Sequence, residues 1–255
     1  MNRKAVLKTI SVVLVFFVAL TIVYSANGQR PKKKKSGAKK VCPNVNTFDQ
    51  CPVNGCGSPG EADLNEQKNI RTINLADAGP SDLKDLLKMD KPADYVDGGS
   101  RQPLKQAGEG KVVTTVAWLM DIRKGSPESC NCYFKEPVNT DNHMVLLNNL
   151  VINKFAPKDW EKHSLTAEFT PRVRQNGHPN FTREKIRPLI LKDPRKRLWV
   201  RLTGPLMFDG YHEVHPLQKG RETNWEIHPV FRFEYCPANK KCTLDSNANW
   251  RNIEQ

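Results

Sequence analysis

Carboxylate and imidazole side chains occur two residues apart in two segments of this chain, which is a spacing that suits a metal site. Glu226 and His228 form one such pair, and Asp141 and His143 form the other. On a β-strand, residues two apart point to the same face and lie roughly 6–7 Å apart. Carboxylates and imidazoles are common ligands of zinc and manganese. We therefore expect Asp141, His143 and His228 to hold one divalent transition metal ion, with Zn²⁺ and Mn²⁺ as the candidates.

Further side chains would extend this chemistry. An open coordination position would activate water, with Glu168 or Glu226 as general base, and Arg172 would neutralise a phosphate or carboxylate of the ligand. The hypotheses are a face that binds a metal ion or an anionic ligand, and a metal-dependent hydrolase of the phosphodiesterase or nuclease type. A third is a structural polar network with cross-strand charge pairs on a solvent-facing sheet. The residues leave open whether the protein is an enzyme.

The segment 224–235, which carries Glu226 and His228, has the period of a β-strand. Its odd positions carry Trp225, Ile227, Phe231, Phe233 and Tyr235, and its even positions carry Glu226, His228, Arg232 and Glu234. Successive side chains of a strand point to opposite faces, so one face fits a core and the other carries the pair. The His228-Pro229 step would mark a bulge or a bend.

Four more strands and one helix are expected in the same half of the chain. The strands are predicted at 112–122, 142–147, 165–170 and 198–203, and the helix at 181–191, with Asn180 as its cap and Pro188 ending or kinking it. Five strands with one helix between the third and fourth is the element order of the OB-fold, a small five-stranded, partly open barrel. Other small antiparallel barrels would give a similar order. In the OB-fold the second, third and fifth strands are neighbours, which would bring the polar residues onto one patch.

Several short motifs lie along this predicted barrel: E-S-C-N-C at 128–132, D-x-H at 141–143, V-R-x-T-G at 200–204 and W-E-I-H-P at 225–229. They are similar to motifs of a group of uncharacterised exported bacterial proteins with a predicted OB-like domain. The resemblance covers roughly residues 108–236, about half of the chain. It implies an OB-like barrel that carries the polar patch, in a protein of the cell envelope. It implies no established activity.

The first 28 residues have the composition of an export signal. Basic residues precede an uncharged apolar stretch of eighteen residues, 9–26, and Ala26 and Gly28 suit the −3 and −1 positions of a cleavage site. Eighteen residues is also the shortest length of a spanning helix, so a membrane anchor is the alternative. We expect a protein exported to the periplasm or the medium, or anchored in the inner membrane by residues 9–26.

The basic charge of the chain is concentrated before residue 41. Residues 1–40 contain ten Lys and Arg and no Asp or Glu, which leaves 30 basic against 27 acidic residues in 41–255. Most of the net charge of +13 therefore belongs to residues 1–40. Their segment 29–40 is expected to be a disordered linker attracted to anionic surfaces. The nearly neutral folded part does not support nucleic acid as a partner. The membrane is a partner if the apolar segment is retained.

Seven cysteines follow the apolar segment, and in an exported protein they favour disulfides. They are Cys42, Cys51, Cys56, Cys130, Cys132, Cys236 and Cys242. Paired C-x-x-C spacing, typical of structural zinc sites, is missing. Cys236 and Cys242 would close a small loop, and the odd number leaves at least one thiol free or paired to another chain. The remaining connectivity stays open.

The expected organisation has three parts after the linker. Residues 41–110 form a cysteine-containing irregular region, with one short helix near 81–89 capped by Ser81 or Asp82. Residues 111–236 form the barrel and 237–255 a C-terminal tail. The sequence contains no phosphate-binding loop, no H-E-x-x-H, no G-x-S-x-G and no dinucleotide fingerprint, which excludes the enzyme classes that depend on them.

Overall fold

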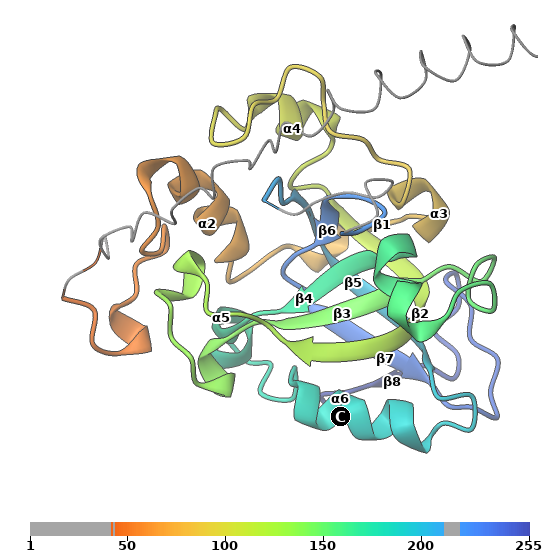
Figure 1. The fold of residues 1–255 in the computed structure, drawn as a ribbon. Helices are drawn as coiled ribbons and strands as arrows, with labels where there is room; N and C mark the ends of the chain where they lie inside the picture. The colour runs from red at the N-terminus through yellow and green to blue at the C-terminus, as the bar shows by residue number, and fades with distance from the viewer. Residues whose placement is uncertain (1–41, 43, 212–219) are drawn as a thin grey trace, which may run out of the picture. The chain divides into compact units, whose positions relative to one another are not determined.

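A computed structural model describes residue 42 and residues 44–211 and 220–255 (Figure 1). The expected signal or anchor (1–28) and linker (29–40) lie outside these residues. Within the described part of the chain, no helix combines the length and the apolar character that crossing a membrane requires.

Five strands close into a barrel, as the element order predicted. They are β2 (Val112–Lys124), β3 (Asn142–Leu147), β4 (Leu165–Phe169), β5 (Leu198–Phe208) and β6 (Trp225–Ile227). The hydrogen-bonded order is β2-β3-β4-β6-β5, and pairing of β5 with β2 closes the ring. The β4–β6 pair is parallel and the other pairs are antiparallel. This is the strand order of the OB-fold, and the predicted fold class is confirmed.

The predicted fifth strand, 224–235, is two strands. β6 ends at Ile227, the His228–Pro229 peptide bond is cis, and β7 runs from Arg232 to Cys236. Both pieces pair with β5, β6 with its C-terminal end and β7 with its N-terminal half. β5 itself extends five residues beyond the predicted end at residue 203, because its partners β2 and β6 continue that far.

The predicted helix between the third and fourth barrel strands is α6 (Arg183–Lys192), with Thr182 rather than Asn180 as the N-cap. A shorter helix, α5 (Pro171–Gln175), precedes it in the same connection and was not predicted. The Thr182 hydroxyl accepts from the amide of Lys185. Pro188 lies inside the helix and does not end it. Ile186 and Ile190 are buried in the barrel core, so α6 belongs to the same hydrophobic core as the strands.

The core follows the predicted alternation. In β4 the side chains of Leu165, Ala167 and Phe169 enter the barrel, while Thr166 and Glu168 belong to its outer face. In β6 the residues Trp225 and Ile227 enter the core. The polar residues of the neighbouring strands β3, β4 and β6 thus share the outside of the barrel.

Short elements surround the barrel. The α-helices are α2 (Ala62–Lys68), α3 (Leu83–Leu86), α4 (Gln102–Ala107) and α5 (Pro171–Gln175). The 3-10 helices are η1 (Phe48–Gln50), η2 (Pro59–Glu61), η3 (Leu75–Asp77), η4 (Ser129–Asn131), η5 (Pro137–Asn139) and η6 (Pro157–His163). Two-residue strands β1 (Gly79–Pro80) and β8 (Arg251–Asn252) extend the sheet at its edges. α3 is the short helix expected near 81–89, and Asp82 caps it.

One group of these elements covers the polar outer face. We call residues 44–69, which include α2, together with loop 128–132 the cap. The disulfide Cys51–Cys132 joins its two segments. The Asn69 amide donates to the carbonyls of Val53 and Cys130, and the amide of Cys56 donates to the carbonyl of Ser129. The cap is the structural element that encloses the site described next.

Candidate metal centre between the barrel and its cap

Strand register aligns His143, Glu168 and His228 in one row across three strands. His143 is paired directly with Glu168 in the antiparallel β3–β4 ladder. The parallel β4–β6 ladder pairs Thr166 with Glu226 and Ala167 with Ile227, so Glu168 stands beside His228 one step further on. Oε1 of Glu168 lies 3.2 Å from Nε2 of His143, and Oε2 lies 3.3 Å from Nδ1 of His228. Glu168 therefore has an imidazole at each oxygen.

The environment of His228 is enclosed and incompletely hydrogen-bonded. Its Nδ1 also lies 3.4 Å from Oε2 of Glu226, and both residues are fully buried. Among the residues that the structure describes, neither ring nitrogen of His228, nor Oε2 of Glu168 or Glu226, has a hydrogen-bond partner. The other oxygen of Glu226 accepts from the buried Arg221. Buried polar atoms are almost always satisfied in folded proteins, so this convergence of unsatisfied atoms suits an additional bound group.

Asp141 completes a set of three metal-ligating groups. One ligating atom from each of Asp141, Glu168 and His228 lies within 4.8 Å of the other two. All three residues are at most 1 % exposed. Two ligand atoms about 2.0–2.1 Å from a tetrahedral ion are about 3.4 Å apart, which is close to the Glu168–His228 separation. Asn131 donates to Oδ1 of Asp141 at 3.1 Å and orients the carboxylate.

The cap contributes a buried ion-pair network on the opposite side. Lys68, from the last turn of α2, contacts Glu128 at 2.7 Å and Asp209 at 2.8 Å. Oε1 of Glu128 faces the barrel, 3.9 Å from Nε2 of His143. A pocket of about 290 Å³ reaches these residues from outside, with Tyr133 and Tyr211 among its lining. Glu128 thus lies between the pocket and the row of barrel ligands.

Burial sets the protonation of the carboxyl groups. It raises the pKa of Glu168 to about 7, against the attraction of His228. Burial likewise raises the pKa of Asp141, and the charge of Glu128 adds to the effect. Burial would also raise the pKa of Glu128, but the Lys68 ammonium outweighs it and holds that pKa at about 2. Near neutral pH, Glu168 is therefore the carboxyl whose charge a bound cation would change most readily.

Two glycines leave the space that these side chains occupy. A Cβ at Gly125 would lie 2.9 Å from Nε2 of His143. A Cβ at Gly204 would lie 2.3 Å from the carbonyl oxygen of Pro229, so only glycine lets the turn after β6 cross β5 this closely. This turn carries His228. Gly204 ends the V-R-x-T-G motif, which gives that motif a local packing reason.

The structure brings together five of the predicted site residues: Asp141, His143, Glu168, Glu226 and His228. The third hypothesis placed such residues on a solvent-facing sheet, whereas the cap buries four of them almost completely and leaves His143 partly exposed. Glu168, expected as a general base, is placed among the ligating groups.

Arg172 lies outside this group. It is buried at the start of α5, and its Nη2 donates to the backbone carbonyls of Cys51 and Pro52 at 2.9 and 3.0 Å. The guanidinium also lies over the ring of Phe48. These contacts attach the cap to the barrel, whereas the expected contact with an anionic ligand remains a prediction.

Sequence reasoning missed Lys68, Glu128 and Arg221 as members of the site. Lys68 belongs to a region that was expected to be irregular, and Arg221 lies in an expected loop. Glu128 opens the E-S-C-N-C motif, which is the one signal that could have drawn attention to it. Arg221 pairs with Glu226 five positions away, and the ion pairs of Lys68 span at least 60 positions.

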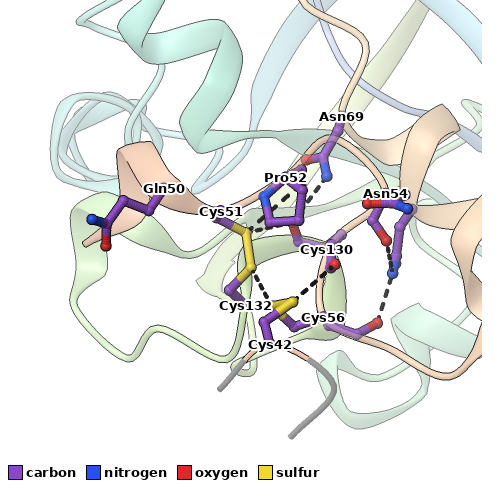
Figure 2. The surroundings of a disulfide bond; sticks show 12 residues. Cys42, Gln50, Cys51, Pro52, Asn54, Cys56, Asn69, Cys130 and Cys132 are labelled. Atoms are coloured by element: carbon purple, nitrogen blue, oxygen red, sulfur yellow. Dashed lines mark hydrogen bonds between the residues drawn. A yellow bond between two sulfur atoms is a disulfide. The ribbon is translucent and has the colours of Figure 1, made fainter. Parts of the chain in front are cut away.

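Three disulfides account for six of the seven cysteines: Cys42–Cys56, Cys51–Cys132 and Cys236–Cys242. The expected small loop between Cys236 and Cys242 is confirmed, and the free thiol is Cys130. Figure 2 shows the first two disulfides next to Cys130, whose carbonyl accepts from Asn69. Disulfides are consistent with an exported protein.

Comparison with known proteins adds no identity: no family model, no curated protein and no solved structure matches this chain. The functional conclusion therefore rests on the site. Its Cys, Asp, Glu and His groups could hold a metal ion.

Proposed function

We propose that this protein binds a divalent transition metal ion between Asp141, Glu168 and His228, beneath the disulfide-linked cap. The observation that carries the proposal is the convergence of these three buried groups within 4.8 Å. Oε2 of Glu168 and both ring nitrogens of His228 have no hydrogen-bond partner in the described part of the chain, which supports them as ligand atoms.

The electrostatics favour a cation at this position. Burying an unpaired carboxylate costs several kcal/mol, and here Asp141, Glu168 and Glu226 are buried together. Arg221 compensates Glu226, which leaves Asp141 and Glu168 to be neutralised by protons or by a bound ion. Oxygen and imidazole ligands suit Zn²⁺ or Mn²⁺.

His143 and Glu226 would support the ligands. Glu226, held by Arg221, lies 3.4 Å from Nδ1 of His228, the ring nitrogen that also faces Glu168. It would hold the imidazole toward the ion from the same side as Glu168. His143 lies against the oxygen of Glu168 that faces away from His228 and orients that carboxylate.

A metal-dependent hydrolase is a second candidate, favoured by one observation. Three protein ligands leave an open coordination position, as in catalytic zinc sites, and the pocket lined by Lys68, Glu128 and Asp209 reaches the cap side of the centre. A bound metal would lower the pKa of a coordinated water. Lys68 would then be the cation nearest to an anionic substrate group.

We further propose that the protein is exported and belongs with the envelope proteins whose motifs it resembles. The three disulfides support this proposal, because such bonds persist in oxidising compartments. The apolar segment 9–26 would be the signal or the anchor.

The test is the metal content of the full chain after export, measured by elemental analysis. We expect at least one equivalent of transition metal in the wild type and its loss in His228→Ala. His163→Ala is the matched control, since His163 belongs to η6 and to none of the ligand groups. Near-ultraviolet circular dichroism reports whether each variant keeps its fold. Wild-type protein that contains no metal, and binds none when Zn²⁺ or Mn²⁺ is added, would refute the proposal and leave a structural polar network.

A further inference from the structure

A second group of ligating atoms adjoins the first on the cap side. Atoms of Glu128, Cys130 and Asp141 lie within 4.8 Å of one another. Sγ of Cys130 is 3.7 Å from Oε2 of Glu128 and 4.0 Å from Oδ2 of Asp141. Cys130 is 1 % exposed and is the one cysteine outside the disulfides. A thiol therefore lies buried between two carboxylates.

This arrangement has the composition of a cation-binding site. Contacts of 3.7 and 4.0 Å from a thiol are weak hydrogen bonds, and they join Cys130 to two acids that repel each other. Asn131, the next residue, donates to Asp141 through Nδ2, while its buried Oδ1 has no hydrogen-bond partner among the residues described by the structure. An unsatisfied buried oxygen beside the cluster is a second and independent observation that favours an additional bound group.

The two ligand groups share Asp141 and form one continuous centre. Asp141 belongs to the set with Glu168 and His228 and to the set with Glu128 and Cys130. The two oxygens of a carboxylate can each contact a different ion. We propose that a second divalent ion binds between Glu128, Cys130 and Asp141, so that Asp141 bridges two metal ions; this rests on the proposed function of the first site.

The charges of the surroundings support two ions. Five carboxyl groups and one thiol line the combined centre: Glu128, Asp141, Glu168, Asp209, Glu226 and Cys130. The ion pairs described for the centre give it two fixed cations, Lys68 and Arg221. The nearby Arg172 and Arg174 direct their hydrogen bonds to backbone carbonyls. If all six acids are ionised, four negative charges remain, which equals the charge of two divalent ions.

Thiolate ligation also determines which metal the second subsite takes. Binding forms a metal–sulfur bond and releases the thiol proton to water. Thiolate is a soft ligand that selects Zn²⁺ over Mn²⁺, whereas the first subsite with oxygen and nitrogen ligands accepts either. Oε2 of Glu128 faces Cys130 and also contacts Lys68, so an ion in this subsite would share that oxygen with the Lys68 ammonium, while Oε1 faces His143.

The experiment is a titration of metal-free full chain with Co²⁺, a spectroscopic substitute for Zn²⁺. Metal is removed with a chelator in the absence of reductant, because the disulfides hold the cap. We expect two Co²⁺ per chain, and a sulfur-to-cobalt charge-transfer band in the near ultraviolet. Cys130→Ser should lose the band and one equivalent, and His228→Ala should lose the other equivalent and keep the band. Ser129→Ala, in the same loop, should keep both ions and the band.

The outcomes separate this inference from the proposed function. One Co²⁺ per wild-type chain, without a charge-transfer band and dependent on His228, overturns the second subsite and leaves the first. Two ions without the band exclude Cys130 as a ligand and also overturn the inference. Absence of any bound Co²⁺ removes both sites. The wild-type spectrum decides the question even if Cys130→Ser fails to fold.

Discussion

Glu168 and His228 stand side by side because β4 and β6 run parallel and in register, with Oε2 of Glu168 3.3 Å from Nδ1 of His228. They come from strands separated by α5, α6 and β5. The same residue faces His143 across the β3–β4 ladder. Glu168 is therefore the side chain on which the geometry of the candidate centre depends most directly.

Glu168→Gln tests this dependence, because it keeps the volume and removes the charge. We expect metal affinity to fall by on the order of 100-fold, at or beyond the upper end of the loss seen when a supporting residue of a metal site is removed. The measurement is a competition titration against a metal-binding dye. An unchanged affinity would show that Glu168 is not a ligand.

The pH dependence of stability should reverse when metal is added. In metal-free protein the pKa of Glu168 is raised from about 4.5 to about 7, so between these values the folded state binds more protons than the unfolded state. The contribution of Glu168 to folding stability is complete below pH 4.5 and is lost as the pH rises through 7. Metal needs the ionised carboxylate, so metal-dependent stabilisation should increase over the same range.

Thermal unfolding at pH 5 and pH 8, with and without Zn²⁺, checks this expectation. The difference between wild type and Glu168→Gln isolates the contribution of this one carboxyl from other titrating groups. If the two proteins show the same pH dependence without metal, Glu168 does not titrate as described.

The disulfides should differ in their effect on stability. Cys51–Cys132 closes a loop with a sequence separation of 81, and Cys236–Cys242 closes one of 6. By the chain-entropy relation, removing them should cost about 4.5 and about 2 kcal/mol of unfolding free energy. The measurement is urea unfolding of the double variants Cys51→Ala/Cys132→Ala and Cys236→Ala/Cys242→Ala. Only the first should also weaken metal retention, since only that bond holds the cap.

Gly204→Ala should disturb the candidate centre through the turn that carries His228. The added Cβ would meet the carbonyl oxygen of Pro229 at 2.3 Å and Cγ2 of Ile227 at 2.8 Å, and the turn that carries His228 must move. We expect a loss of about 1–3 kcal/mol in stability, typical of overpacking, and weaker metal binding. Gly79→Ala is the control, since nothing lies within 4 Å of its Cβ, and it should change stability by less than about 0.5 kcal/mol. Equal effects of the two substitutions would contradict this explanation.

The amino-acid sequence determined the barrel and most of its elements. Alternating apolar residues and flanking turn residues located β3 and β4 closely, because those signals arise from the strand's own side-chain period. The order of strands and helix predicted which strands would be neighbours, and so which polar residues would meet. The cysteine pattern also predicted the Cys236–Cys242 disulfide, because these two cysteines are close in the sequence.

The tertiary structure decided that the polar face is buried. Alternation places Glu226 and His228 on the outside of a barrel, but it carries no information on whether another segment covers that outside. The cap does so through contacts between distant residues, such as Lys68 with Glu128 and Arg172 with Cys51. These contacts bury the charges, raise the pKa of Glu168 and bring Cys130 to Asp141. Burial and long-range proximity depend on packing between segments, so no local pattern in the sequence encodes them.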